Sequence, residues 1–206
     1  MLWIRKDTQA RQIAVPSADI TAAVITLRDR IVFVAAVYVA KKENVDDPEL
    51  TSALEHLRTA ITQVGSQTNG VLELLICGDF NRHDQLWGGD LVYGSPRSGE
   101  GAPIIDFMED FHLQNLLPRG TVTYESAGHS STIDLILASP QLTEEMNNYS
   151  PTSTAYGRDY LAIETYFETD VPYQELEAQY TFRSANWEAV RSEMRKTLVK
   201  KPSLDA

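Results

Sequence analysis

The sequence contains a single cysteine, Cys77, among its 206 residues. An intrachain disulfide and a cysteine-based zinc site each need more than one cysteine, so both are excluded. The sequence also lacks any run of about 18 apolar residues, which excludes a transmembrane helix. Its first residues, Met-Leu-Trp-Ile-Arg-Lys-Asp, contain no apolar stretch of the kind found in secretory signals. We therefore expect an intracellular protein, cytoplasmic or nuclear, without a membrane partner.

Basic residues are scarce, because 18 Lys and Arg stand against 29 Asp and Glu, for a net charge of −11. Residues 1–42 hold seven basic and three acidic residues (+4), residues 43–182 hold five and 23 (−18), and residues 183–206 hold six and three (+3). Non-specific binding of nucleic acid depends on Lys and Arg that neutralise phosphates, so the acidic middle argues against it. Acidic residues suit a divalent-cation site instead. We expect few basic residues beside such a site.

Apolar and β-branched runs alternate with helical patterns along the chain. Residues 20–27 and 31–39 predict two adjacent strands, and residues 71–77 predict a buried strand. Apolar residues at spacings of three and four predict an amphipathic helix over residues 50–64. This interleaving favours an α/β fold with a layered core. Further elements are predicted over residues 104–111 and 183–194 (helices) and over residues 121–124, 132–137 and 160–167 (strands).

Glycine, serine and proline are frequent in residues 79–103, which predicts a long loop. Loops of that length are uncommon in compact domains and are often functional. The four histidines of the sequence show no His-x-His or His-Glu-x-x-His spacing, so they do not indicate a zinc site. We interpret His83 and Asp84, the nearest approach to a ligand pair, as surface loop residues.

Polar side chains stand at the ends of the predicted strands. The buried strand over residues 71–77 leads directly to Asp79 and Asn81, and strand ends are rigid places to hold such groups. Asp134 lies inside an apolar strand, where an unpaired carboxylate would be costly, so it should have a partner. Taken alone, each feature also has an ordinary structural explanation. A Gly-Asp pair suits a turn, and a tyrosine in a strand, such as Tyr38, usually packs.

Three motifs in this order give the chain a family resemblance. They are Gly-Asp-Phe-Asn at 78–81, Thr-Ile-Asp-Leu at 132–135 and Gly-Arg-Asp-Tyr at 157–160. The set resembles the endonuclease/exonuclease/phosphatase superfamily, and most closely the endonuclease domain of LINE-type retrotransposons. The similarity covers roughly residues 21–167. The closer resemblance is carried by the stretches 78–89, 106–124 and 131–139.

The resemblance implies a layered α/β sandwich of two mixed β-sheets flanked by helices. It also implies hydrolysis of phosphodiesters with Mg²⁺ or Mn²⁺ as cofactor and DNA as partner. Such chemistry needs a placed water, a cation on the phosphate oxygens and a donor for the developing charge. By position, the resemblance implies that Asp79 activates water, Asn81 and Tyr38 contact phosphate, Asp134 orients the catalytic histidine, and Asp159 lies near the metal.

The chain departs from the family pattern in two places. The histidine of the last motif is replaced by Tyr160, whose phenol neither shuttles protons nor becomes a cation near neutral pH. The family's metal-binding glutamate lies upstream of the strand over residues 20–27, and none of the 19 residues before that strand is Glu. Arg158 is an addition that could contact a phosphate or pair with a carboxylate.

We therefore expect an N-terminally truncated domain with impaired catalysis. Its parts would be an extension (residues 1–19), the superfamily domain (20–168) and a linker with a C-terminal helix (169–206). An edge exposed by the truncation would favour self-association. Two alternatives stay open, namely a non-catalytic relic or binding module, and a small-molecule phosphodiesterase or phosphatase of the same superfamily.

Overall fold

The computed structural model describes residues 1–41, 46–126, 128–151, 160–169 and 186–199. The chain divides into two units, Met1–Gln174 and Glu175–Ala206. The first unit carries the sheets, most of the helices and the candidate site. The second contributes one described helix.

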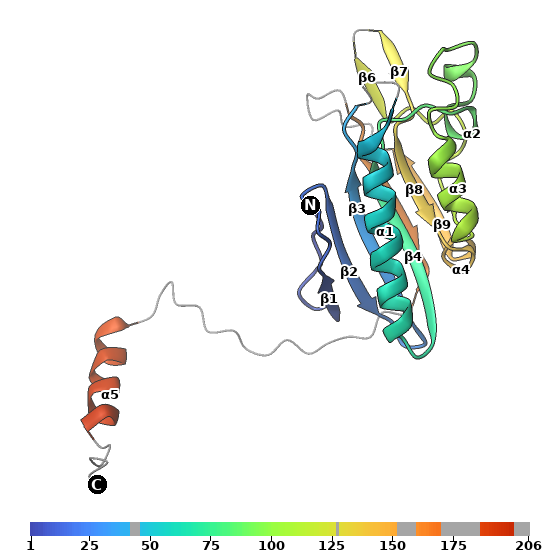
Figure 1. The fold of residues 1–206 in the computed structure, drawn as a ribbon. Helices are drawn as coiled ribbons and strands as arrows, with labels where there is room; N and C mark the ends of the chain where they lie inside the picture. The colour runs from blue at the N-terminus through green and yellow to red at the C-terminus, as the bar shows by residue number, and fades with distance from the viewer. Residues whose placement is uncertain (42–45, 127, 152–159, 170–185, 200–206) are drawn as a thin grey trace. The chain divides into compact units, whose positions relative to one another are not determined.

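A six-stranded mixed sheet forms the centre of the first unit (Figure 1). The predicted pair of adjacent strands is confirmed as an antiparallel hairpin, while the third and fourth strands of the chain run parallel. A parallel pair needs a crossover, and the helix between these two strands supplies it. In sheet order the strands are β1 (Ala10–Ile13), β2 (Ile20–Thr26), β3 (Arg30–Tyr38), β4 (Val71–Asp79), β8 (Asp134–Ala138) and β5 (Gln114–Asn115).

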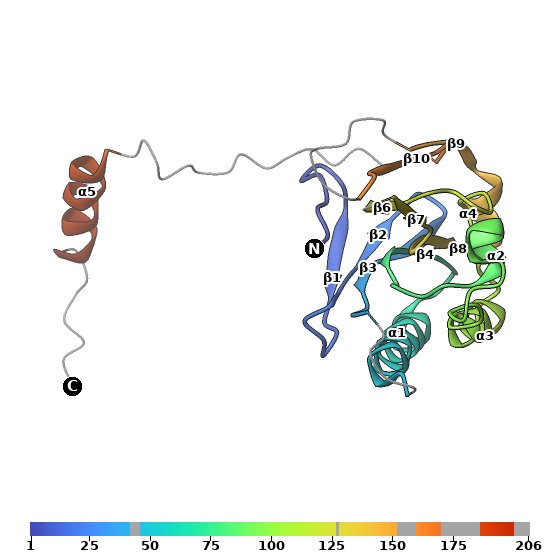
Figure 2. The same ribbon diagram turned by 90° about the horizontal axis from the view of Figure 1, so that it is seen from above.

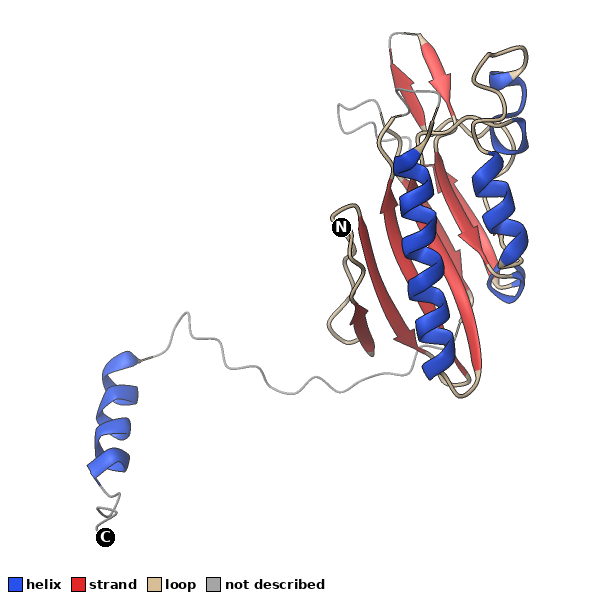
Figure 3. Ribbon diagram, in the orientation of Figure 1, coloured by secondary structure: helices blue, strands red, loops and turns tan. Residues whose placement is uncertain are grey.

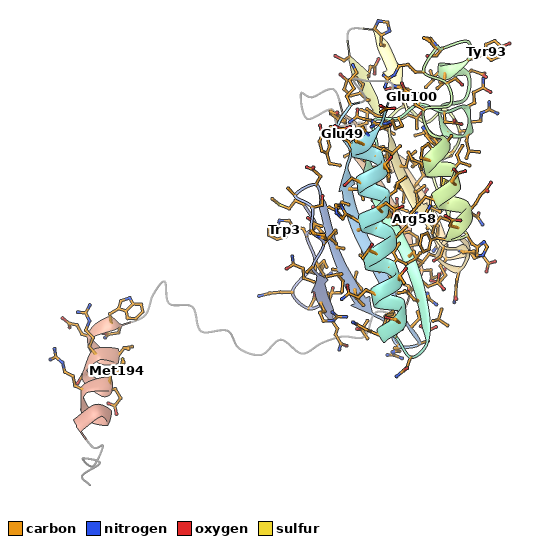
Figure 4. All side chains as sticks on the ribbon, in the orientation of Figure 1. Trp3, Glu49, Arg58, Tyr93, Glu100 and Met194 are labelled. Carbon is orange, nitrogen blue, oxygen red and sulfur yellow. The ribbon has the colours of Figure 1, made fainter. Side chains whose placement is uncertain are left out.

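Two helices, α1 (Pro48–Gln67) and α3 (Ala102–Asp110), cover one face of this sheet (Figures 1 and 2). The amphipathic stripe predicted for α1 is confirmed, because every one of its apolar positions from Leu50 to Val64 is buried. Figure 4 shows Arg58 on α1, whose guanidinium pairs with Asp110 and lies 5.3 Å from the ring centroid of Phe107 on α3. Both helices thus pack on the sheet and contact each other.

A smaller sheet of β9 (Met146–Pro151) and β10 (Ile163–Phe167) lies on the opposite face (Figure 2). A second, smaller core between the layers joins buried residues such as Val34 and Ile136 to the partly buried Phe167. The short helix α4 (Pro140–Glu144) contributes Leu142 to it. Helices, main sheet and second sheet therefore form the layered α/β sandwich that the sequence predicted.

The hairpin of β6 (Tyr124–Ser126) and β7 (His129–Ser131) extends beyond one end of the main sheet (Figure 3). Here the prediction of a strand over residues 121–124 was wrong for its first part. Residues 121–123 lie outside any strand. The Thr123 hydroxyl accepts hydrogen bonds from the backbone N–H groups of Ile133 and Asp134, each at 3.1 Å.

The long loop predicted over residues 79–103 contains local structure. It forms the short helix α2 (Gln85–Gly88) and the 3₁₀ turn η1 (Gly89–Val92). Asp84 caps α2, because its carboxylate accepts a hydrogen bond from Leu86 N–H at 2.9 Å. The loop is anchored by Trp87, whose side chain is fully buried.

The second unit contains α5 (Trp187–Val199). Asn186 caps this helix, because its side-chain oxygen accepts a hydrogen bond from Ala189 N–H at 3.1 Å. The helix begins a few residues later than the sequence predicted. None of the helices in the described ranges is long and apolar enough to cross a membrane.

Candidate active site

Three predicted site residues meet at one edge of the main sheet, where β3 and β4 end and β8 begins. Asp79, the last residue of β4, lies in register between Tyr38 on β3 and Asp134 on β8. The register places the carboxylates of Asp79 and Asp134 on directly paired positions. The sequence predicted each residue at a strand end or inside a strand, and the sheet order brings them together.

Tyr160 completes this group through a contact with Asp79. Its hydroxyl donates a hydrogen bond to Asp79 Oδ2 at 3.1 Å, and the backbone N–H of Asn81 donates to Asp79 Oδ1 at 3.0 Å. Burial raises the pKa of Asp79, while these hydrogen bonds lower it in part. Burial and the charge of Asp79 raise the pKa of Tyr160 to about 12. Tyr160 therefore stays protonated and acts as a donor at neutral pH.

Asn81 has a backbone conformation that few residues adopt readily. Its φ is 48°, in the left-handed region that asparagine tolerates better than most residues. Its side-chain amide donates to the Val39 carbonyl at 3.0 Å, and Val39 N–H donates to the Asp79 carbonyl at 2.8 Å. These bonds fix the ends of β3 and β4 relative to each other, so Asn81 is held at the cleft.

The Asp134 carboxylate has fewer hydrogen-bond partners than the sequence led us to expect. A hydrogen bond with Thr123 lowers its pKa, but Oδ2 is buried and has no hydrogen-bond partner among the described residues. Burial, together with the negative charge of Asp79, raises the pKa of Asp134 to about 6. A substantial fraction of the Asp134 side chains is therefore protonated in weakly acidic solution.

Replacing Asp134 by Asn should stabilise the protein at neutral pH. The folded protein holds the Asp134 proton up to about pH 6, whereas an unfolded chain releases it near pH 4. The free energy of unfolding should therefore fall as the pH rises through this window. The side-chain amide introduced by D134N cannot ionise, so this variant should exceed wild type by about 2 kcal/mol at pH 7 and match it near pH 4. Urea unfolding at several pH values measures the difference.

The exposed Asp90 provides the control for this experiment. D90N removes the same charge from a solvated position, so its stability difference from wild type should stay constant between pH 4 and pH 7. If the stability difference between D134N and wild type also stayed constant between pH 4 and pH 7, ionising Asp134 would not destabilise the folded protein.

Arg82 is a site residue that sequence reasoning missed. Its side chain is fully buried, and its Nε donates to Asp47 Oδ2 at 2.6 Å. Its Nη1 donates to the backbone carbonyls of Ala40 at 2.8 Å and Asn81 at 3.0 Å. Asp47 in turn caps α1, accepting a hydrogen bond from Leu50 N–H. Arg82 thus ties the segment that carries Asn81 to the start of α1.

A cleft of about 520 Å³ opens beside these residues. Tyr38, Asn81 and Tyr160 line it, together with basic side chains from two other segments, Lys41 and Arg97. Basic residues are few here, as expected, because Lys41 and Arg97 are the lysine and arginine residues among the described residues that line the cleft. No Asp or Glu is among the described residues that line the cleft.

His83 lies in a loop and is partly exposed, as expected, and it also lines this cleft. The imidazole is half-buried, and burial followed by the nearby charge of Arg97 lowers its pKa. His83 is therefore neutral at pH 7. No local pattern indicated this position, because the residue follows a strand end in a segment that resembled an open loop.

Two of the predicted residues, Arg158 and Asp159, lie outside the described residues. Within the described ranges, no group of three or more His, Cys, Asp or Glu side chains is arranged to hold a metal ion. Of the two facing carboxylates, Asp79 already accepts protein hydrogen bonds on both oxygens. The described residues therefore do not by themselves form a site that fits a divalent cation.

Comparison with known proteins identifies the family. Residues 32–164 match the endonuclease-reverse transcriptase family, which is well over half of the chain. The chain belongs to this family. The matched range includes the Gly-Asp-Phe-Asn and Thr-Ile-Asp-Leu motifs and Tyr160, as the sequence predicted. No curated protein sequence matches the chain.

Solved structures of this superfamily share the fold. The endonuclease domain of TRAS1, a telomere-specific non-LTR retrotransposon, aligns with a TM-score of 0.62 at 15% identity, over 80% of this chain and 70% of that domain. The AP endonuclease LMAP from Leishmania major aligns with a TM-score of 0.62 at 15% identity, over 81% of this chain and 63% of that protein. The 3′ phosphatase NExo from Neisseria, bound to a product DNA hairpin, aligns with a TM-score of 0.57 at 17% identity, over 80% of this chain and 72% of that protein.

Proposed function

We propose that this member of the endonuclease-reverse transcriptase family binds nucleic acid in the cleft beside Asp79 but hydrolyses phosphodiesters poorly. The observation that carries the proposal is the hydrogen bond from the Tyr160 hydroxyl to Asp79 Oδ2. The structural neighbours include a retrotransposon endonuclease domain and a 3′ phosphatase bound to a DNA hairpin, and Lys41 and Arg97 in the cleft support an anionic ligand.

The proposed roles follow the family resemblance. Asp79 would activate the attacking water, and Asn81 and Tyr38 would contact phosphate. Asp159 would lie near the metal, and Arg158 would contact a phosphate or pair with a carboxylate. Asp134 would orient a histidine, but Tyr160 occupies that position and its hydroxyl bonds to Asp79 instead. Asp134 therefore has no imidazole to orient, which agrees with the orphaned Oδ2.

Impaired hydrolysis follows from the protonation states of these groups. A water that attacks from Asp79 would have to share the lone pairs of this carboxylate with the Tyr160 hydroxyl and the Asn81 N–H. Tyr160, with a pKa of about 12, cannot accept a proton at neutral pH and is a weak acid toward a leaving group. Loss of a general acid or base typically costs about 10²–10⁴-fold in rate. We expect at least this deficit here.

A plasmid-nicking assay tests the proposal. Supercoiled plasmid is incubated with the intact chain, with Mg²⁺ or Mn²⁺ supplied, and open-circular product is measured over hours. We expect nicking at the level of the buffer control, because the groups that would move protons are blocked or missing. The D79A variant, prepared in parallel, should give the same amount of open-circular product over time.

The opposite result is equally clear. Nicking well above the buffer control that disappears in D79A would show that Asp79 works as a catalytic residue despite the bond to Tyr160. It would overturn the proposed impairment. Nicking that persists in D79A would instead identify a contaminating nuclease, which a fresh preparation removes before the comparison is made.

A further inference from the structure

The cleft beside Asp79 is lined by three tyrosines, Tyr38, Tyr124 and Tyr160. Tyr38 is 50% exposed and Tyr160 is 45% exposed, so ring surface on both is open to a ligand. The cleft volume of about 520 Å³ lies in the range of ~300–1,000 Å³ that is usual for ligand pockets. Its size and aromatic walls suit a flat, nucleotide-sized group.

Two of these rings are held in place before any ligand arrives. Tyr160 is fixed through its hydroxyl by Asp79, and its ring meets the Tyr124 ring edge-on with centroids 4.9 Å apart. The backbones of the two tyrosines also form an isolated β-bridge. A prearranged ring loses little conformational freedom on binding, which favours stacking.

The charges of the cleft can neutralise only a few phosphates. Lys41 and Arg97 are the lysine and arginine residues among the described residues that line it. Arg97 also pairs with Glu100 at 2.9 Å, whereas Lys41 forms no hydrogen bond or ion pair among the described residues. The chain as a whole carries a net charge of −11. A duplex, which presents two charged backbones, therefore meets little compensating charge.

We propose that the cleft binds unpaired nucleotides in preference to duplex, with bases stacking on Tyr38 and Tyr160 and flanking phosphates contacting Lys41 and Arg97. The inference rests on the proposed function, since it names the class of nucleic acid that the same cleft takes. Stacking requires an exposed base face, which a duplex hides within its own stack. A sequence-tolerant single-strand site combines such rings with a few cations, as this cleft does.

Fluorescence anisotropy with labelled 12-nucleotide probes tests the preference. The intact chain is titrated with single-stranded DNA, single-stranded RNA of the same sequence, and the DNA duplex. We expect a single-stranded probe to bind at least about tenfold more tightly than the duplex, because each stacked base contributes about 1–3 kcal/mol. The DNA and RNA arms show which sugar the cleft accepts.

Variants of Tyr38 assign the effect to stacking. Tyr38 is a half-exposed residue at the end of β3, so Y38A should fold normally and should bind single strands roughly 5- to 150-fold more weakly. Y38F keeps the ring and should bind single strands more tightly than Y38A, losing only the contact of the Tyr38 hydroxyl with phosphate. Y166A is the matched control, since Tyr166 on β10 is 53% exposed but does not line the cleft.

The salt dependence gives an independent readout. About two phosphate contacts predict a slope of roughly −1.4 for the logarithm of the binding constant against that of the salt concentration. K41Q should reduce this slope by roughly 0.7. Equal or tighter binding of the duplex, with no effect of Y38A, would overturn the inference and leave nucleic-acid binding intact. Failure of every probe to bind would overturn the proposed function itself.

Discussion

Replacing Arg82 by Met should lower the free energy of unfolding by about 3–5 kcal/mol, since removing one partner of a buried ion pair leaves the other charge uncompensated. The change would strand the Asp47 carboxylate and the carbonyls of Ala40 and Asn81, all of which accept hydrogen bonds from this guanidinium. Chemical denaturation measured by circular dichroism gives the loss directly. The corresponding fall in melting temperature should be roughly 10 °C or more.

Two further variants separate charge from geometry at Arg82. R82K keeps the positive charge but loses the planar fork that reaches several acceptors, so it should fall between R82M and wild type. R58M removes an arginine that is 29% exposed and pairs with the surface residue Asp110, and it should cost about 1 kcal/mol or less. If R82M lowered the free energy of unfolding by less than R58M does, the structural role assigned to Arg82 would be wrong.

Truncation of Trp87 to Ala should cost about 3–5 kcal/mol, the usual range for a large aromatic side chain removed from a core. The indole is fully buried, and its Nε1 donates a hydrogen bond to the Arg82 carbonyl at 3.1 Å. The ring also fills the space beside Gly101, where a Cβ atom would lie only 2.1 Å from Trp87 Cη2. Denaturant unfolding measures the loss of stability.

The same variant should release the segment that carries one wall of the cleft. Residues 89–100, including Arg97, are anchored at one end by Trp87, so W87A should make this segment more sensitive to trypsin. L86A is the control, since the neighbouring Leu86 is 51% exposed and contributes little to the core. If W87A and L86A gave equal stability and equal cleavage, Trp87 would not be the anchor.

The sequence predicted those parts of the fold that depend on local pattern. The spacing of apolar residues in α1 and the β-branched runs of β2 and β3 are local signals, and the structure confirms them. Asp79 and Asp134 could be recognised because polar groups inside or after apolar strands need partners. Their mutual pairing depends on the strand order, which the structure supplies.

The remaining features depend on contacts between distant segments. Lys41 and Arg97 belong to a strongly acidic chain, and only folding places them in one cleft. Arg82 resembles a solvated loop residue in the sequence, since its acceptors lie on Ala40, Asp47 and the segment after β4. Counting the charges of each segment reveals neither the two cations of the cleft nor the buried arginine. The predicted self-association through an exposed edge stays a prediction.

The central claim is that the cleft holds nucleic acid without cutting it, and one measurement on one sample tests it. A labelled probe carrying both a duplex and a single-stranded overhang is saturated with excess protein and supplied with Mn²⁺. The bound fraction is read by anisotropy and the cut fraction on a denaturing gel. We expect near-complete binding of the probe, with cleavage no faster than for D79A. Cleavage of the bound probe by wild type, lost in D79A, would contradict the claim.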